Sequence, residues 1–599
     1  MIDYRIEVGD AHAHRFVVTL KVAQPAAEQV FSLPVWIPGS YLVREFARHL
    51  SPITATQGGQ PCEVRCLDKA SWQVRCAGEG ALTLRYEVYA FDTSVRAAFL
   101  DASRGFFNGT SVFLKAHGFE AQPHRVKITG LPRGWSVATA LPAVKVNAQG
   151  VGDYVAADYD ELIDHPVELG TFWRGAFTVR GVQHEFVVAG APADFDGQRL
   201  LDDTRKVCEA QIAFWHGRRK APFQHYVFML NAVEDGYGGL EHRASTALIC
   251  SRKDLPRQGR PLNQDAYTTL LGLISHEYFH TWNVKRLKPV AFDPYELSRE
   301  NPTRMLWFFE GFTSYYDDQF LLRTGLIDAA TYLKLLARTV NLVLAAPGRL
   351  QYSVGQASFD AWTRYYRQDE NTANATVNYY TKGSLVALAL DLSLRALPAR
   401  GDGQLPSLDG VMRRLWALGR AITEADVTQA LADEAGAPPK GAKTTDALAG
   451  WQTALHAWTE GTGDLPLPEL LSEHGVAWST KAGSLAQQLG VKLSESGGAL
   501  KVQAVMHGGA GEEAGLSAGD ELLALAGWRL RKADDLTTWH DASRAQPLLL
   551  ARDGRVLTVS LPALQGRALS PAAADVVTLM PADSPQPEAL QRRRAWLTR

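Results

Sequence analysis

The chain has 599 residues, of which 46% are hydrophobic and 21% are charged, and these proportions are ordinary for a soluble globular protein. One hydrophobic core rarely serves so long a chain, so we expect three or four domains. The formal net charge of −2 argues against nucleic acid as the main partner, because binding to phosphates needs a strong basic excess.

The chain carries no apolar stretch near the roughly 20 residues that cross a bilayer, so we expect no membrane partner. Its first residues, MIDYRIEVGDAHAHRF, alternate like a strand and lack the basic cap and apolar run of a secretory signal. We therefore expect a cytoplasmic protein. The five cysteines match no zinc-ribbon spacing, which favours reduced thiols.

Residues 1 to about 170 have the pattern of a series of β-strands. Segments such as RIEVGD, HRFVVTLKVA and ALTLRYEVYAF alternate or run apolar and are separated by Gly, Pro and Asp. Two segments rich in aromatics, Arg and Gly interrupt the pattern, at residues 34–50 and 101–114. Such segments can be binding loops or loops that pack between sheets, and we favour packing.

From about residue 198 the hydrophobic period becomes helical, and helices dominate between residues 262 and 470. The strand HYVFMLNAV and the glycine-rich EDGYGGLEHRASTALIC separate the first of these helices from the rest. Beyond about residue 480 a compact module of short strands and helices follows. The end of the chain is rich in Ala and Pro, and we expect it to be partly disordered or to form a docked terminal helix.

The stretch DAYTTLLGLISHEYFHTWN is predicted to form a helix, with Asn263 or Asp265 as its N-cap. On such a helix His276 and His280 are four residues apart, so both rings project from one face. Two neutral imidazoles placed in this way can bind one zinc ion at about 2.0–2.1 Å, and Glu277 beside them can accept a proton from the attacking water. A bare H-E-x-x-H also arises by chance, and two imidazoles alone make a weak metal site.

A third ligand is predicted in the next helix, ENPTRMLWFFEGFTSYYDDQFLL, which we expect to begin with Asn301 as N-cap and Pro302 at its first position. Glu310 stands in the aromatic part of this helix. A carboxylate in such surroundings is costly unless it is paired or binds a metal. We therefore favour metal binding by Glu310 over an exposed position on the helix.

HEYFH followed by WFFEGFTSYY resembles the gluzincin metallopeptidases, in which two histidines and a downstream glutamate hold one zinc ion. More narrowly, the chain resembles the glycyl-aminopeptidase family, through PVWIPGSYLVREFARH, HEYFHTWNVKRLKP, WFFEGFTSYY and GTGDLPLPELL. The resemblance covers nearly the whole chain and implies a multidomain α+β fold. The implied parts are an N-terminal β-sandwich-like domain (1–170), a thermolysin-like catalytic domain (171–400), its helical extension (401–478), a PDZ domain (479–566) and a C-terminal tail (567–599).

The resemblance also implies where the substrate lies. GGLEH occupies the place of the edge-strand motif that lines the substrate cleft in related aminopeptidases. Gly238 and Gly239 would allow close approach of the backbone, and Glu241 would bind the ammonium group of the peptide. A surface position for Glu241 remains the alternative.

NYYTKGSLVALALDL resembles the segment that carries the aminopeptidase tyrosine, whose hydroxyl group donates a hydrogen bond to the oxyanion. The YTKG motif selects Tyr380, with Tyr379 as a near rival. A phenol donor where negative charge develops lowers the barrier by around 3 kcal/mol. Either tyrosine could instead pack at the start of a helix. One departure from thermolysin-type sites is Ser314, where those sites have an acidic residue, so the groups that orient the histidines are not predicted.

The C-terminal module resembles PDZ domains of the bacterial protease type. QQLGVKL would supply the carboxylate-binding loop and the strand beside which a peptide or protein C-terminus adds, with Leu489, Gly490 and Val491 as the predicted contacts. The alternative is a module that only packs on the catalytic part, with its groove occupied.

The resemblance implies a zinc metalloaminopeptidase for peptides with a free N-terminus, with small first residues, Gly and Ala, preferred. One Zn²⁺ would be held by His276, His280 and Glu310, with Glu277 as catalytic base. Two alternatives remain: a metalloendopeptidase assisted by the PDZ domain, and a non-catalytic peptide-binding scaffold. The presence of Glu277 together with all three ligand types argues against the scaffold.

Overall fold

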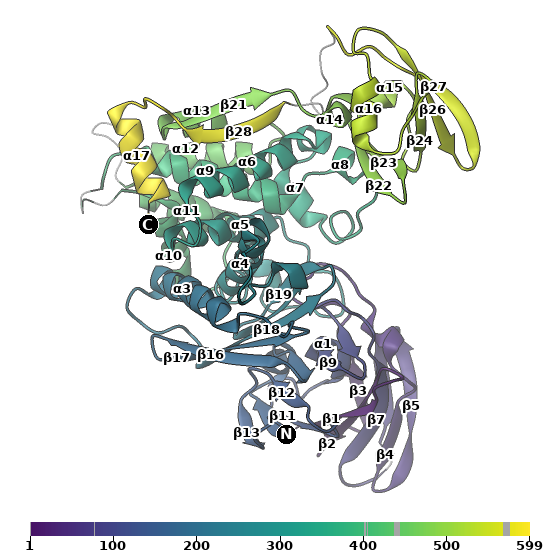
Figure 1. Cartoon of the computed structure of the whole chain (residues 1–599). Helices are drawn as coiled ribbons and strands as arrows, with labels where there is room; N and C mark the ends of the chain where they lie inside the picture. The colour runs from purple at the N-terminus through teal and green to yellow at the C-terminus, as the bar shows by residue number, and fades with distance from the viewer. Residues whose placement is uncertain are drawn as a thin grey trace. The chain divides into compact units, whose positions relative to one another are not determined.

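The computed structural model describes residues 2–76, 78–400, 403, 405–436, 444–566 and 575–598. The chain divides into two compact units, Met1–Asn301 and Pro302–Arg599. The first unit begins with a β-rich region and the second is largely helical, so the chain has the predicted multidomain α+β organisation (Figure 1). The finer domain boundaries stay a prediction.

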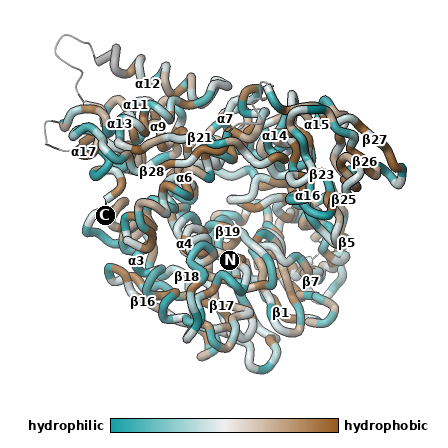
Figure 2. Tube along the Cα trace, turned by 45° about the horizontal axis from the view of Figure 1, so that its top comes forward, coloured by the Kyte–Doolittle hydropathy of each residue, from teal (hydrophilic) through white to brown (hydrophobic). Residues whose placement is uncertain are grey.

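The β-rich region of the first unit consists of two sheets. Its strands are β1 (Ile2–Asp10), β2 (Arg15–Val22), β3 (Glu28–Ser32), β4 (Thr54–Gln57), β5 (Gln60–Asp68), β6 (Ser71–Arg75), β7 (Leu82–Tyr89), β8 (Ala98–Leu100), β9 (Arg104–Phe107), β10 (Lys115–Ala116), β11 (His124–Thr129), β12 (Ser136–Ala138), β13 (Ala143–Val146), β14 (Gly152–Ala156) and β15 (Val167–Gly170). One sheet has the order β10-β3-β6-β5-β4-β7-β2-β1-β11-β14-β13 and the other β12-β15-β9-β8. In β1 the side chains of Ile2, Tyr4 and Ile6 are buried while Arg5 is exposed, because successive side chains of a strand point to opposite faces. Figure 2 shows hydrophilic and hydrophobic residues mixed along the chain trace.

The two segments that interrupt the strand pattern are packed, as favoured from the sequence. In residues 34–50, which include the 3-10 helix η1 (Phe46–His49), Trp36 and Tyr41 are fully buried. The indole Nε1 of Trp36 donates to the carbonyl oxygen of Glu296 at 2.9 Å. Residues 101–114 contain β9 and the short helix α1 (Gly109–Val112), all four residues of which are buried.

A second, five-stranded sheet region completes the first unit. Its elements are β16 (Trp173–Val179), β17 (Val182–Ala189), α3 (Gly197–His216), β18 (His225–Val233), β19 (Tyr237–Glu241), β20 (Ser245–Ser251), η2 (Arg252–Asp254), α4 (Gln264–Phe279) and η3 (Val290–Phe292). The strand order is β16-β17-β18-β20-β19, so β19 is an edge strand, antiparallel to β20. Helix α4 packs against β19 and β20, which places its last turn beside the glycine-rich edge strand.

The helical part of the second unit is built around the pair α5 and α9. The helices are α5 (Leu306–Arg323), α6 (Ala329–Leu344), η4 (Pro347–Leu350), α7 (Val354–Phe359), α8 (Thr372–Ala375), α9 (Tyr379–Arg395), α10 (Leu408–Ala417), α11 (Glu424–Ala435), α12 (Thr444–Thr459) and α13 (Leu467–Glu473). Helices α5 and α9 cross where Gly311 meets Gly383, and a Cβ on Gly311 would lie 2.5 Å from the Gly383 α-carbon. Only glycine allows the two backbones to approach this closely.

The predicted start of α5 is wrong. The helix begins at Leu306 with Met305 in the N-cap position, whereas Asn301 and Pro302 were expected to open it. The side chain of Asn301 is engaged elsewhere: its Oδ1 accepts from the Glu296 amide at 2.9 Å and its Nδ2 donates to the Glu296 carbonyl at 2.7 Å. The side-chain amide of Asn301, which could have capped the helix, therefore binds the backbone of the preceding loop instead.

The C-terminal part of the second unit has two further sheets. Its elements are β21 (Val476–Lys481), α14 (Leu485–Leu489), β22 (Val491–Ser496), β23 (Ala499–Val505), α15 (Ala510–Glu513), β24 (Glu521–Leu525), β25 (Trp528–Arg529), α16 (Ala533–Trp539), β26 (Gln546–Arg552), β27 (Arg555–Leu561), β28 (Val576–Pro581) and α17 (Pro587–Leu597). One sheet has the order β22-β23-β24-β26-β27, with β25 beside β24, and β21 pairs with β28. In the segment predicted as a tail, residues 567–574 lie outside the described residues, and β28 and α17 follow. Among the described residues, no helix combines the length and the apolar character that crossing a bilayer requires.

Two buried histidines of the first unit make stability depend on pH. Burial lowers the pKa of His184 to about 4, and burial likewise lowers the pKa of His165 to about 4. In the unfolded chain such rings take up a proton near pH 6.5. Unfolding therefore binds protons between about pH 6.5 and pH 4, and the free energy of unfolding falls as the pH drops through this window, by up to about 3 kcal/mol for each ring.

Urea unfolding between pH 7.5 and pH 4.5 measures this dependence. His184 accepts or donates at the Tyr278 hydroxyl group at 2.8 Å, so His184→Phe is expected to lower stability at pH 7.5 but to flatten the dependence on pH. Replacement of the exposed His12 by glutamine is the control and should leave the slope unchanged. An unaltered slope in His184→Phe would show that this ring does not contribute.

Candidate active site

His276 and His280 bring two imidazole nitrogens together at the end of α4. Their Nε2 atoms lie 3.0 Å apart and their rings are nearly perpendicular, at 83°. Two nitrogen ligands of one tetrahedral zinc ion are separated by about 3.3 Å, given zinc–nitrogen bonds of about 2.0–2.1 Å. The two rings therefore lie side by side, as the spacing predicted. The distance between their Nε2 atoms is close to that of two nitrogen ligands of one metal ion.

The helix ends earlier than the sequence pattern indicated, at Phe279 rather than near Asn283, and this end orients His280. His280 occupies the C-cap position, and its Nδ1 lies 2.7 Å from the carbonyl oxygen of Asn283. A carbonyl oxygen can only accept, so Nδ1 carries the proton and Nε2 presents its lone pair. A backbone carbonyl thus supplies the orienting contact that ligand histidines need.

Glu277 lies between α4 and the edge strand β19. Its side chain is buried, at 5% exposure, and it packs on the backbone of Gly239. A Cβ on Gly239 would overlap the Glu277 carboxylate and lie 2.5 Å from its Cγ. At Gly238 the same construction meets only Arg96 Nη1, at 3.7 Å. Of the two predicted glycines, Gly239 is therefore the one that makes room for the glutamate.

Glu241, at the end of β19, is buried rather than exposed on the surface. One oxygen of Glu241, one oxygen of Glu277 and one ring nitrogen of His280 all lie within 4.8 Å of one another. Two ionised carboxylates this close in a buried place repel each other, and a cation or a shared proton relieves the repulsion. The first unit therefore contains a cation-attracting pair of carboxylates directly beside the histidine pair.

In the second unit, Glu310 lies on α5 with 1% exposure. Tyr379 and Tyr380 open α9, the helix that packs on α5. Tyr379 is fully buried, whereas Tyr380 is partly exposed and its hydroxyl oxygen lies 3.4 Å from that of Tyr366. Burial, and then the charge of Glu310, raise the pKa of the Tyr380 phenol well above its usual value, so it remains a hydrogen-bond donor at neutral pH.

Comparisons with known proteins show the family of the chain. A sequence model described as the peptidase M61 N-terminal domain matches residues 3–171, and one described as M61 glycyl aminopeptidase matches residues 269–386. The crystal structure of an aminopeptidase N family protein from Idiomarina loihiensis is 36% identical, covers all of both chains and superposes with a TM-score of 0.89. The chain belongs to the M61 glycyl aminopeptidase family. It is therefore a peptidase of the metallopeptidase class of hydrolases.

More distant structures are also similar to this M61 peptidase. An M1 zinc metallopeptidase from Deinococcus radiodurans is 16% identical, with a TM-score of 0.44, and the match covers 78% of this chain and 95% of that chain. A point mutant of the same Deinococcus enzyme, bound to a Tyr-Ser-Ala substrate, has a TM-score of 0.45 at the same identity and coverage. No curated protein matches the sequence.

Gly39 is a residue of this M61 peptidase that the sequence did not single out. It lies in the packed segment of residues 34–50, with φ at +96°, and a Cβ on it would overlap the Glu241 carboxylate, 2.7 Å from Oε1. The backbone of Gly39 therefore packs against the Glu241 carboxylate, just as the backbone of Gly239 packs against the Glu277 side chain. The only signal in the sequence was a glycine inside an aromatic segment, which does not tell where its backbone packs.

Arg96 is a second residue that the sequence did not indicate. Its Nη2 donates to the carbonyl oxygen of Gly239 at 3.2 Å and so fixes the edge strand from the β-rich region. The N-terminal M61 match includes both Gly39 and Arg96, so this region contributes directly to the surroundings of Glu241 and Glu277.

The predicted PDZ contacts are in the C-terminal part of the second unit. Leu489 ends α14, Gly490 has φ at +69° in the left-handed region, and Val491 begins β22. β22 is the edge strand of its sheet. Gly490 thus joins a short helix to an edge strand, and the binding of a peptide C-terminus there stays a prediction.

Proposed function

We propose that this M61 peptidase is a zinc-dependent aminopeptidase that removes small N-terminal residues, Gly and Ala first, from peptides with a free N-terminus. The observation that carries the proposal is the buried pair of Glu241 and Glu277 beside His280. Glu277 serves as the general base in any peptidase of this type, and Glu241 adds a second buried negative charge beside it. The ammonium group of a substrate with a free N-terminus is a cation that this negative charge would attract.

We assign one Zn²⁺ to His276, His280 and Glu310. Two imidazoles and one carboxylate are the donor set of many catalytic zinc sites. A bound zinc ion would polarise the scissile carbonyl group and make a water molecule more acidic. The burial of Glu310 supports its assignment, since a carboxylate in an apolar helix needs a cation or a hydrogen-bonding partner.

The remaining residues of the site handle protons and charge. Glu277 takes a proton from the attacking water and passes it to the leaving amine. Tyr380 donates a hydrogen bond to the oxyanion, and its partial exposure supports it over the fully buried Tyr379. Glu241 binds the ammonium group, and the edge strand at Gly238 and Gly239 lies along the substrate backbone.

Glu241→Gln tests the function. The variant keeps the shape of the side chain but loses its charge, and a charged hydrogen bond contributes about 1.5–3 kcal/mol, so kcat/KM for Gly- and Ala-peptides is expected to fall about 10–100-fold. N-acetylated peptides should be poor substrates of both proteins. Equal cleavage of free and acetylated peptides by the parent protein would contradict the proposal and favour an endopeptidase.

Gly39→Ala provides a second route to the same residue. The added methyl group overlaps the carboxylate of Glu241, so the same loss for free peptides is expected without a change in charge. Gly59→Ala is the matched control, because Gly59 also has a positive φ, +83°, but a Cβ there has no atom within 4 Å. Both variants bear the backbone strain, and only Gly39→Ala disturbs Glu241.

For the C-terminal part we propose a PDZ domain that binds a peptide or protein C-terminus at Leu489, Gly490 and Val491. The left-handed Gly490 and the edge position of β22 support this, because an edge strand can accept an added strand. The core beneath it is dominated by leucines, including Leu489, Leu500, Leu522 and Leu550. C-terminal peptides titrated onto the full chain measure this binding.

A further inference from the structure

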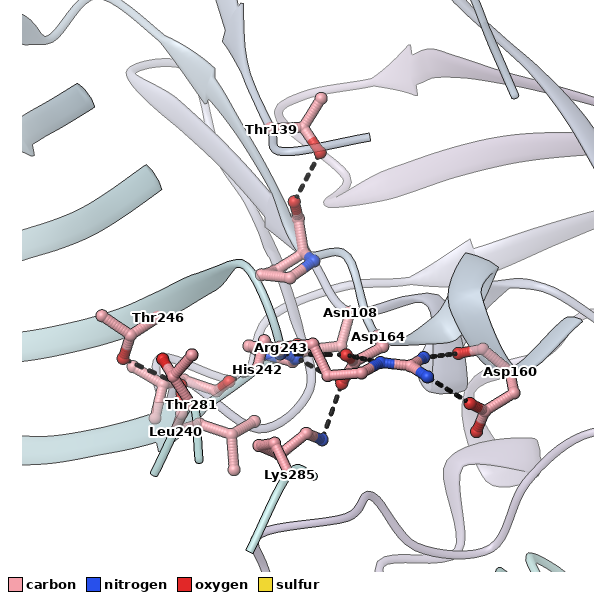
Figure 3. A network of polar contacts seen from close by, with 12 residues as sticks. Asn108, Thr139, Asp160, Asp164, Leu240, His242, Arg243, Thr246, Thr281 and Lys285 are labelled. Atoms are coloured by element: carbon pink, nitrogen blue, oxygen red, sulfur yellow. Dashed lines mark hydrogen bonds and ion pairs between the residues drawn. The ribbon is translucent and has the colours of Figure 1, made fainter. Parts of the chain in front are cut away.

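A single buried carboxylate, Asp164, joins the β-rich region to the surroundings of the proposed site. Asp164 follows α2 (Tyr159–Ile163) and is 6% exposed. Its oxygens accept from Lys285 Nζ at 2.6 Å, from Arg243 Nε at 2.7 Å, from the Arg243 amide at 3.0 Å and from His242 Nδ1 at 3.3 Å. Figure 3 shows Arg243 and Lys285 reaching Asp164 from different parts of the chain.

The donors belong to the two segments that carry proposed site residues. His242 and Arg243 directly follow Glu241 and form the turn between β19 and β20. Lys285 follows the end of α4, and its amide donates to the carbonyl oxygen of His280 at 3.1 Å. Asp164 therefore contacts His242, one residue after the proposed ammonium-binding Glu241. It also contacts Lys285, five residues after the proposed zinc ligand His280.

Arg286 connects the same two segments from the other side. Its Nη1 donates to the carbonyl oxygen of Arg243 at 2.8 Å and to that of Thr281 at 2.7 Å. The hydrogen bonds of Arg286 therefore join the turn after β19 to the turn after α4. Asp164 accepts from side chains of both turns, Arg243 in the first and Lys285 in the second. A displacement of either turn would be passed to the other.

The carboxylate of Asp164 compensates the positive charges of Lys285 and Arg243. Lys285 is 3% exposed at its side chain, so its ammonium group relies on Asp164 for compensation. Arg243 has a second carboxylate, Asp160, at 2.8 Å, and depends on Asp164 less. Burial alone would raise the pKa of Asp164, but the charges of Lys285 and Arg243 outweigh it and hold the pKa well below its usual value, so the carboxylate stays ionised.

We propose that Asp164 is a positioning residue of the peptidase site, which holds Glu241 and His280 in their mutual arrangement through the His242–Arg243 turn and Lys285. The proposal rests on the proposed roles of Glu241 and His280. It gives the β-rich region a part in catalysis, because Asp164 lies within the match to the M61 N-terminal domain.

Asp164→Asn in the full, zinc-loaded chain tests the proposal. The amide keeps the shape but loses the charge, and contacts that orient metal ligands typically change metal affinity or activity about 10–100-fold. We expect zinc affinity, measured by competition with a chelator, to weaken at least tenfold. We also expect kcat/KM for Gly-peptides to fall about 10–100-fold, with a smaller fall for any residual cleavage of acetylated peptides.

Glu168→Gln is the matched control. Glu168 is as buried as Asp164, lies in the same region and forms a two-pronged ion pair with Arg104, at 2.7 Å for both contacts. It should lower the urea midpoint while leaving zinc affinity and kcat/KM unchanged. If Asp164→Asn behaved in the same way, Asp164 would be only a structural residue and the proposal would be overturned.

Lys285→Met covers the case in which Asp164→Asn does not fold. The Lys285→Met variant leaves Asp164 paired with Arg243 and His242, so it should fold. We expect its zinc affinity to fall strongly, and its preference for free over acetylated N-termini to change less. Unchanged zinc affinity in Lys285→Met would overturn the proposal. If the parent protein binds no zinc or cleaves acetylated peptides equally well, the proposed function itself fails, and this outcome is visible before any variant is compared.

Discussion

Replacement of Glu277 by glutamine is expected to lower kcat by about 10²–10⁴-fold, the usual contribution of a general base. The amide has the size of the carboxylate but cannot accept the proton of the attacking water. The side chain is buried against Gly239, so the variant has no reason to rearrange, and the neighbouring histidines keep their arrangement. Zinc content and KM for Ala-peptides should therefore stay near those of the parent protein.

The measurement is steady-state kinetics on Gly- and Ala-peptides together with the metal content of both proteins. Glu209→Gln is the control, because Glu209 is exposed on α3, in the same unit. Substantial activity in Glu277→Gln would remove Glu277 from the mechanism. Loss of zinc together with activity would instead show that this side chain holds the metal site together.

Replacement of Gly239 by alanine is expected to lower kcat about 10²-fold in a protein that still folds. The new methyl group overlaps the end of the Glu277 side chain, which is flexible, so Glu277 moves and the backbone does not have to. A misplacement of about 1 Å at a reacting group can cost this much in rate. Alanine at the neighbouring Gly238 meets no atom closer than 3.7 Å and is expected to have little effect on kcat.

The comparison of these two variants isolates the contact between the edge strand and Glu277. Both substitutions change the same strand in the same chemical way, and the urea midpoint shows whether either disturbs the fold. Equal kcat values for the two variants would mean that the position of Glu277 does not depend on Gly239. Double replacement with Glu277→Gln should show no further loss, since the base is already absent.

The arrangement of the two candidate zinc-binding histidines could be predicted from the sequence because it is local. Residues four apart on a helix share a face whatever surrounds the helix, and the structure has His276 and His280 with their nitrogens 3.0 Å apart. Glu310 was indicated by its apolar neighbours, and it is buried. The burial of Glu241 agrees with the substrate role that the resemblance implied, although its role remains a proposal.

The residues that surround these groups could not be predicted, because their contacts join distant parts of the chain. Gly39 packs on Glu241 and Asp164 binds Lys285, and no local pattern links either pair. The predicted start of α5 is wrong for a related reason. Asn301 has the side chain of a good N-cap, but its side-chain amide forms hydrogen bonds with the backbone of Glu296. Local preference loses where a tertiary contact offers the same hydrogen bonds.

The contact of Gly311 with Gly383 limits which substitutions this chain can accept. Neither position can gain a side chain without parting two helices, one of which carries Glu310 and the other Tyr380. Any redesign of the chain must therefore leave this crossing intact and change positions where new volume meets no close atom. Gly39 is not such a position, because a Cβ there would overlap the Glu241 carboxylate, whereas a Cβ on Gly238 meets only Arg96 Nη1, at 3.7 Å, so new volume on the edge strand belongs at Gly238.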